Sequence, residues 1–273
     1  RTMEQLRGVL EWPGGVGMVY CDFEDVRRYR EAVEMARGAG LAVGLATLRV
    51  VKPAEEGLLK QIADCGADAV LVRNLAAVSF YAERGVPMIG DYSLNVANEL
   101  TAGVMAEAGV RRMVPSYDLN WQQMAAMLGR VPVELFEVVV HQHMPMFHME
   151  HCVFAHTLSN GKDCRDCGRP CDRHRVDLRD RVGMAHPLLP DVGCRNTLFN
   201  AAAQSAAEYV PEMKRLGVKW YRVEMLRESG EEVGRLLEEY AKILAGVEEG
   251  KQAIRKLRAL NQLGVTRGTL DWV

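Results

Sequence analysis

Short apolar runs alternate with helix-like stretches from Val16 to His141, and this alternation limits the folds open to the chain. The runs expected as strands are Val16–Cys21, Leu41–Leu48, Ala69–Val72, Val86–Gly90, Arg111–Ser116 and Leu135–His141. The stretches expected as helices are Asp25–Arg37, Ala54–Cys65, Leu75–Glu83, Ala97–Ala108 and Leu119–Leu128. Several of these helices are followed by a glycine that suits a helix C-terminus, such as Gly40 and Gly66. The βαβα order favours a parallel sheet covered by helices.

The alternation stops at residue 142 and resumes after residue 199. Beyond the gap the sequence predicts a helix over Ala201–Leu216 with Asn200 as its N-cap, and a strand over Val218–Glu224. A helix over Ser229–Gly246 follows, because Ser229 and Glu232 have capping-box spacing and an apolar stripe runs behind them. A basic helix over Glu248–Leu260 is expected last.

Seven expected strands are one short of a TIM-type barrel. The predicted fold class is therefore α/β, a (β/α)8-like barrel that is complete only if one strand is hidden in the gap. A doubly wound open sheet is the alternative. The predicted domains are a barrel-like unit over residues 1–246, with an insertion at 142–199, and a C-terminal helix and tail over 247–273.

Composition narrows the function classes. The net charge of −2 gives no electrostatic reason to expect a membrane or nucleic-acid partner from the chain as a whole. No apolar run is long enough to span a bilayer, and no secretory signal is visible at the N-terminus. Seven cysteines in a long chain without such a signal favour reduced, metal-binding thiols over disulfides, so a cytoplasmic location is expected.

Histidine and cysteine are concentrated in the gap. All seven histidines lie between His141 and His186. Five of the seven cysteines lie in the same stretch or, in the case of Cys194, just beyond it. These cysteines are Cys152, Cys164, Cys167, Cys171 and Cys194. Four thiolates at such spacing suit either zinc or an iron–sulfur cluster, and the spacing alone leaves both open. Cys21 and Cys65 stand apart and are expected to be small buried apolar residues.

The segment "ELFEVVVHQHMPMFHMEHC…DCRDCGRPC" resembles the signature region of the peptidase U32 family. Glu137, His141 and Cys152 match its first part, and Asp166 to Cys171 match its closing Asp-Cys-x-x-Pro-Cys. Upstream, "GADAVLV" and "DYSLNVANEL" resemble family motifs, with Asn95 and Asn98 on the two family asparagines. Downstream, "LGVKWYRVEML" places Glu224 on a family glutamate.

The chain departs from the common family pattern at two positions. Pro145 stands where the family has its first cysteine, and Ser93 stands at a usual glutamine. The chain looks instead like a long subgroup with an extra domain of unknown function, in which Cys194 would compensate. The ligands that the resemblance implies are Cys152, Cys167, Cys171 and Cys194, with Cys164 left over.

The resemblance implies a [4Fe–4S] cluster, with zinc as the alternative cofactor, and functions that conflict. The family was named for collagenase-like peptidases, while other branches support hydroxylation of ribosomal RNA, transfer RNA or a ubiquinone precursor, with prephenate implicated as oxygen source. We expect support of RNA-base hydroxylation, with RNA and a small anionic co-substrate such as prephenate as partners, with or without a partner subunit. A U32-type peptidase and a non-catalytic iron–sulfur RNA-binding module are the alternatives.

The sequence contains no Gly-x-Ser-x-Gly and no His-Glu-x-x-His motif, and a cysteine held by a cluster is not a free nucleophile. A redox function uses the same cysteines and histidines and does not require a free nucleophile. The expected catalytic residues are His141, His143, His148 and Glu224. The expected substrate-binding residues are Asn95, Asn98, Arg173, Arg175 and Arg179, the arginines because guanidinium groups suit phosphates and carboxylates.

Overall fold

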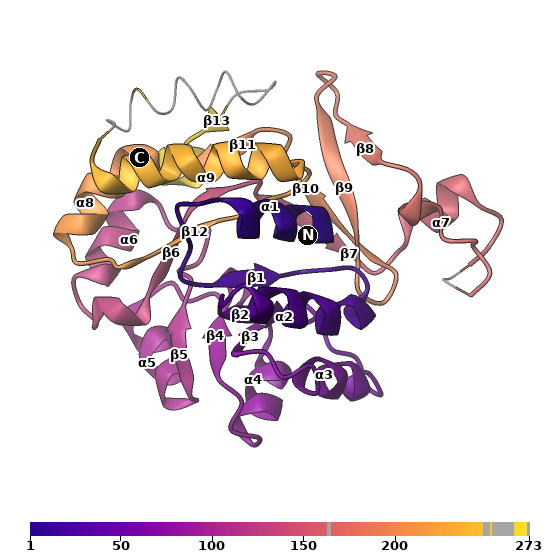
Figure 1. The fold of residues 1–273 in the computed structure, drawn as a ribbon, viewed down its shortest axis with the longest axis horizontal. Coiled ribbons are helices and arrows are strands. Elements are labelled where there is room, and N and C mark those ends of the chain that lie inside the picture. The colour runs from indigo at the N-terminus through magenta and orange to yellow at the C-terminus, as the bar shows by residue number, and fades with distance from the viewer. Residues whose placement is uncertain (163–164, 248–251, 253–264, 272–273) are drawn as a thin grey trace.

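A computed structural model describes residues 1–162, 165–247, 252 and 265–271 (Figure 1). The predicted helix Glu248–Leu260 and Cys164 lie outside these described residues, apart from Gln252. Within the described part, no helix is long and apolar enough to cross a membrane.

A five-stranded parallel sheet forms the first half of the chain. Its strands lie in chain order: β1 (Val19–Cys21), β2 (Val43–Ala46), β3 (Ala69–Val72), β4 (Met88–Gly90) and β5 (Val110–Met113). The connecting helices are α2 (Tyr29–Gly38), α3 (Glu56–Ala63), α4 (Leu75–Ala82) and α5 (Glu99–Glu107). β2, β3 and β4 are buried along their whole length, as expected for parallel strands covered on both faces.

The parallel order continues beyond β5. An isolated parallel bridge joins Met113 to Phe136, just before β6 (Glu137–Gln142), and β6 pairs in parallel with β12 (Trp220–Val223). All seven predicted strands are therefore present. Their sequential order has no reversal, which is the winding of a barrel and not of a doubly wound sheet. The described residues form an arc and not a closed barrel, since β12 and β1 are not hydrogen-bonded to each other.

Two helices lie across the interval between β1 and β12. They are α1 (Met3–Glu11) and α9 (Gly230–Ala245), which pack on each other (Figure 1). The predicted capping box of Ser229 and Glu232 begins α9, and Gly246 ends it in the left-handed conformation. α6 (Trp121–Leu128) connects β5 to β6.

The gap in the βα pattern contains a second, antiparallel sheet. Its order is β7 (Pro145–Met149), β10 (Arg195–Phe199), β9 (Ala185–Asp191) and β8 (Val176–Arg179). A short helix, α7 (Val153–Leu158), and a 3₁₀ turn, η4 (Pro170–Asp172), lie between β7 and β8. In Figure 1 this insertion projects from the side of the parallel sheet.

The helix predicted over Ala201–Leu216 is wrong in its first half. β11 (Ala203–Ser205) pairs with β6 and with β13 (Val265–Thr266), and only α8 (Val210–Arg215) is α-helical. Pro211 occupies the first turn of α8, where its missing N–H costs nothing, so an α-helix through this proline from Ala201 is disfavoured. Asn200 is not an N-cap, and its carbonyl oxygen contacts His143 instead.

Candidate metal centre and active site

The four cysteines named as ligands line one small cavity of about 20 Å³. They come from three separate turns of the insertion. Cys152 is the N-cap of α7, and its Sγ accepts a hydrogen bond from the Ala155 amide at 3.5 Å. Cys167 lies just before η4, Cys171 is the middle residue of η4, and Cys194 lies in the β9–β10 turn.

Local backbone geometry turns these sulfurs toward the cavity. Gly168 and Arg169 both have positive φ, at 66° and 51°, and this turn lets the Arg169 amide donate to Cys167 Sγ at 3.4 Å. Cys194 has φ of 60°, which is uncommon for a residue with a side chain. N–H···S hydrogen bonds of this kind tune sulfur ligands of metal clusters.

The donor set fits a metal centre. Burial, together with the Glu24 carboxylate, raises the pKa of the Cys171 thiol to about 11, so a thiolate at this position requires a neighbouring cation. In the described part of the chain, the one group of three metal-ligand side chains within 4.8 Å of one another is Glu24, Cys171 and Asp172, not three cysteines. Four thiols around one cavity are a donor set that either a zinc ion or an iron–sulfur cluster uses.

Glu24 connects the cysteine cavity to the parallel sheet. It follows β1, lines the cavity, and lies 3.3 Å from the Arg169 guanidinium, which also contacts Asp172 at 2.8 Å. Burial raises the pKa of Glu24. A groove of about 850 Å³ passes Cys171 and Arg169 and reaches Asp22, at the carboxyl end of β1.

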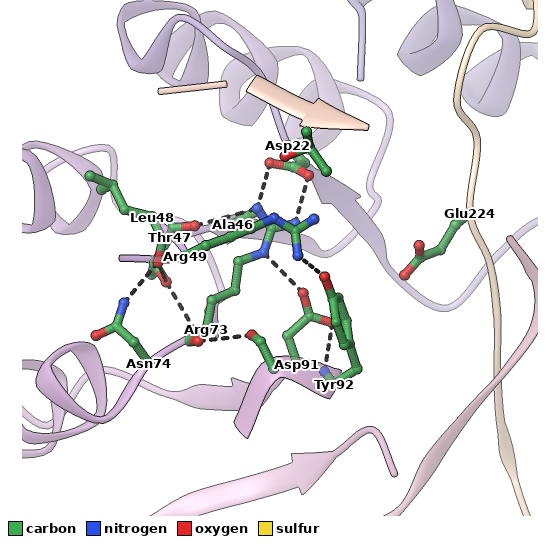
Figure 2. Close-up of polar contacts among 12 residues, drawn as sticks. Asp22, Ala46, Thr47, Leu48, Arg49, Arg73, Asn74, Asp91, Tyr92 and Glu224 are labelled. Atoms are coloured by element: carbon green, nitrogen blue, oxygen red, sulfur yellow. Dashed lines mark hydrogen bonds and ion pairs between the residues drawn. The ribbon is translucent and has the colours of Figure 1, made fainter. Parts of the chain in front are cut away.

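A buried polar network begins at the carboxyl ends of β1, β3 and β4 (Figure 2) and continues to residues within β12 and β6. Arg73, directly after β3, contacts Asp22 at 2.6 Å and Asp91, directly after β4, at 2.9 Å. On β12, Arg222 contacts Asp91 at 3.0 Å and Glu137 at 2.5 Å. Together the five residues link five strands of the arc: β1, β3, β4, β6 and β12.

The arginines hold these carboxylates ionised. Burial by itself would raise the pKa of Asp91, but Arg73 and Arg222 outweigh it and keep the pKa below its usual range. Burial acts on Glu137 in the same way, and Arg222 with Arg112 lowers its pKa. Arg112 contacts Glu137 at 2.7 Å.

A cavity of about 730 Å³ extends from this network into the interval between β1 and β12. Arg49, Arg222 and Glu224 line its polar part. Within the described residues, the Arg222 Nη2 atom is buried and has no hydrogen-bond partner. The Arg49 guanidinium lies over the Tyr92 ring, 5.2 Å from its centroid. The volume is in the range of small-molecule sites.

Glu224 is the predicted catalytic residue that joins the network. Its Oε1 lies 3.3 Å from Arg222 and accepts a hydrogen bond from Tyr117 Oη, also at 3.3 Å. Figure 2 shows its carboxylate directed toward the side of the network that holds Asp91 and Tyr92.

The three predicted catalytic histidines have separate partners. His141 is buried, its Nδ1 lies 3.1 Å from Tyr240 Oη, and burial lowers its pKa to about 3. His143 Nδ1 lies 2.8 Å from the Asn200 carbonyl oxygen. His148 Nδ1 lies 2.9 Å from Thr197 Oγ1, and burial lowers the pKa of His148.

The predicted substrate-binding residues lie outside the network. Asn95 is exposed in the left-handed conformation at the end of a 3₁₀ turn, and Asn98 is exposed as the N-cap of α5. Arg173, Arg175 and Arg179 are exposed on and beside β8. Both asparagines thus have local backbone roles, and the arginines face solvent.

Asp22, Arg73, Asp91 and Arg222 were not predicted from the sequence. A signal was present, because Asp22, Arg73 and Asp91 each come directly after a short apolar strand. The carboxyl ends of parallel strands meet at one edge of a sheet, and the same rule selected Glu224.

Comparisons with known proteins match most of the chain, including the cysteine cavity and the polar network. The model of the family described as "Peptidase family U32" matches residues 19–268. A structure titled "The Structure of the U32 Peptidase Mk0906" is similar at 14% identity and a TM-score of 0.38, over 49% of this chain and 59% of that chain. A dimeric archaeal Rubisco from Hyperthermus butylicus is similar at 13% identity and a TM-score of 0.45, over 94% of this chain and 59% of that one. The chain thus spans 59% of the length of each of these two structures. No curated protein matches the sequence.

Proposed function

Because this chain belongs to peptidase family U32, we propose that it is an iron–sulfur protein that supports hydroxylation of an RNA base, with an anionic co-substrate such as prephenate as oxygen donor. The observation that carries the proposal is the convergence of Cys152, Cys167, Cys171 and Cys194 on one cavity. These four side chains would hold a [4Fe–4S] cluster, which supplies one-electron chemistry when bound.

The groove beside Cys171 supports a connection between the cluster site and the polar network. It borders Cys171 on one side and Asp22 on the other, so a substrate in the groove would contact both regions. In open α/β sheets and in barrels, ligands bind at the carboxyl ends of the strands, which is where the network lies.

The buried arginines suit the anionic co-substrate better than the exposed ones. Arg222 lines the 730 Å³ cavity, and its Nη2 atom is buried and unpartnered among the described residues. A carboxylate oxygen in the cavity would give this N–H its missing acceptor, which removes the cost of a buried unsatisfied donor. We therefore move the expected anion site from Arg173, Arg175 and Arg179 to Arg222.

Glu224 would orient the ring that is hydroxylated. Its carboxylate is 29% exposed and is held by Arg222 and Tyr117. A carboxylate accepts hydrogen bonds from the exocyclic amine of cytosine or the N–H of another base. Its role would be to hold the edge of the base in the 730 Å³ cavity, which Glu224 lines.

The peptidase alternative has less support in this geometry. Ser205 Oγ lies 2.7 Å from Tyr240 Oη, which in turn contacts His141, but Ser205 is 1% exposed and has no access to a peptide. A cysteine that binds a cluster donates its sulfur electron pair to iron and is not free to attack a peptide bond.

Deletion of the gene followed by nucleoside analysis of digested ribosomal and transfer RNA tests the proposal. One hydroxylated nucleoside should disappear and return with the intact gene, but not with a Cys171→Ser copy. The Cys65→Ser copy is the control and should restore the nucleoside. Unchanged RNA together with gelatin cleavage by cluster-free protein would establish the peptidase alternative instead.

A further inference from the structure

A projecting hairpin of the insertion carries a group of exposed arginines. We call residues 173–184 the arginine arm; they comprise β8, its flanking residues and the turn into β9 (Figure 1). β8 is the edge strand of its sheet, so one side of the arm is not covered by another strand. Arg175, Arg179 and Arg181 are exposed along it.

The acidic residues of this region are engaged elsewhere. Asp177 pairs with Arg227, Asp172 pairs with Arg169, and Asp180 accepts from two backbone amides and lies 3.3 Å from His186. For the structure as described, Arg175, Arg179 and Arg181 therefore have no carboxylate partner. The arm presents three uncompensated guanidinium groups to solvent.

The spacing of these groups favours an extended anion over a small one. Arg175 and Arg179 are four residues apart along an extended chain, about 13 Å at 3.3 Å per residue. A single dicarboxylate is too short to bridge them, while successive phosphates of a nucleic acid strand lie within such a span. Leu178 and Val182, which are 50% and 85% exposed, offer apolar contacts on the same arm.

The arm is continuous with the candidate active site. Arg175 and His174 line the same groove as Cys171 and Asp22. A strand that lies on the arm could therefore direct one base into the groove.

We propose that the arginine arm binds the phosphate backbone of a single-stranded RNA segment through Arg175, Arg179 and Arg181. This inference rests on the proposed function, since it supplies the docking surface for the RNA whose base is modified. Phosphate contacts position a nucleic acid without reading its sequence, and they make binding dependent on salt.

The test uses the anaerobically purified full chain and fluorescein-labelled polyuridylate as the probe. The variant replaces Arg175, Arg179 and Arg181 with Gln; Arg173 is left intact because its guanidinium donates to the Gly168 carbonyl beside Cys167. Affinity should fall at least about tenfold at low salt, and the slope of log K against log salt should become shallower by about 2, at about 0.7 per lost contact. Iron and sulfide content should stay at the unmodified level.

A matched control separates the arm from net charge. Arg7, Lys60 and Arg111 are exposed on other elements, and their replacement by Gln removes the same total charge. This control should bind polyuridylate nearly as well as the unmodified protein. A second variant with Lys at the three arm positions should keep most of the salt slope.

Three results would overturn the inference. They are an arm variant with unchanged affinity and slope, an equal loss in the control, and an arm that binds polyglutamate but not polyuridylate, which would identify an acidic protein partner. Failure of the inference and failure of the proposed function can be told apart. Arm-dependent RNA binding without any missing nucleoside in the deletion strain would refute the hydroxylation and leave the arm intact.

Discussion

Arg222 balances the buried charge of the network, so its removal should have a large and specific cost. Its guanidinium contacts Glu137 at 2.5 Å, Asp91 at 3.0 Å and Glu224 at 3.3 Å, and its side chain is 6% exposed. In an Arg222→Met variant Asp91 keeps Arg73, Glu137 keeps Arg112 and Asp22 keeps Arg1, but Asp91 and Glu137 each lose one of their two buried cationic partners.

The magnitude follows from the loss of these two contacts. If one carboxylate must take up a proton at pH 7, its pKa has to rise by about 3 units from the usual value near 4, which costs about 4 kcal/mol at 1.36 kcal/mol per unit. The measured cost of breaking a buried ion pair, about 3–5 kcal/mol, agrees. We expect Arg222→Met to lower the free energy of unfolding by about 3–5 kcal/mol, measured by urea denaturation of the anaerobically purified protein.

A second substitution tests the cause. Arg222→Met combined with Glu137→Gln removes one of the two buried carboxylates that lost Arg222, and it should recover at least about 1 kcal/mol relative to Arg222→Met alone. A carboxylate whose pKa is raised in folded Arg222→Met binds a proton that the unfolded chain does not bind between about pH 4 and 7, so the stability difference from the unmodified protein should shrink as the pH falls through this range. A loss below about 1 kcal/mol for the single variant, or no recovery in the double variant, would refute the electrostatic reasoning.

Three further predictions follow from the site. Replacement of any one ligand cysteine by Ser should abolish bound iron and labile sulfide, whereas Cys21→Ser should spare them; loss of iron in Cys21→Ser would contradict the ligand assignment. His141 is neutral in the folded protein because its pKa is about 3, while the unfolded chain takes up a proton at this residue below about pH 6.5. The free energy of unfolding should therefore fall by up to about 1.4 kcal/mol per pH unit as the pH drops from 6.5 toward 3. The urea midpoint of a His141→Gln variant should depend less on pH over this range. Glu24→Gln weakens the contact with Arg169 and should speed release of iron to a chelator several-fold, while Asp25→Asn, on a neighbouring residue that pairs with Arg27, should not.

The parallel core could be predicted from the sequence because its signals are local. Each buried strand is a short apolar run, and a glycine with positive φ follows several helices, as at Gly40 and Gly66. The insertion could not be predicted in this way. β8 and β9 pair across a turn without regular apolar alternation, and β7 finds its partner β10 about 50 residues along the chain, so no local pattern reports the pairing.

The cysteines of the site were predicted, but its buried polar network was not, again because only local patterns can be read from one sequence. The four cysteines were selected by spacing and family resemblance, and the structure places them around one cavity, although their role as ligands stays a prediction. The network of Arg73, Asp91 and Arg222 was missed because a charged residue in one sequence is usually solvent-exposed. Its burial depends on strands that are far apart in the chain, such as β4 and β12.

The most direct test of the iron–sulfur proposal is the metal content of the anaerobically purified chain. Iron, labile sulfide and zinc should be assayed on the same sample, together with its visible absorption spectrum. The four-cysteine cavity predicts about four iron and four sulfide per chain and a brown sample. One zinc per chain with no sulfide would contradict the iron–sulfur centre and, with it, the redox function proposed for this protein.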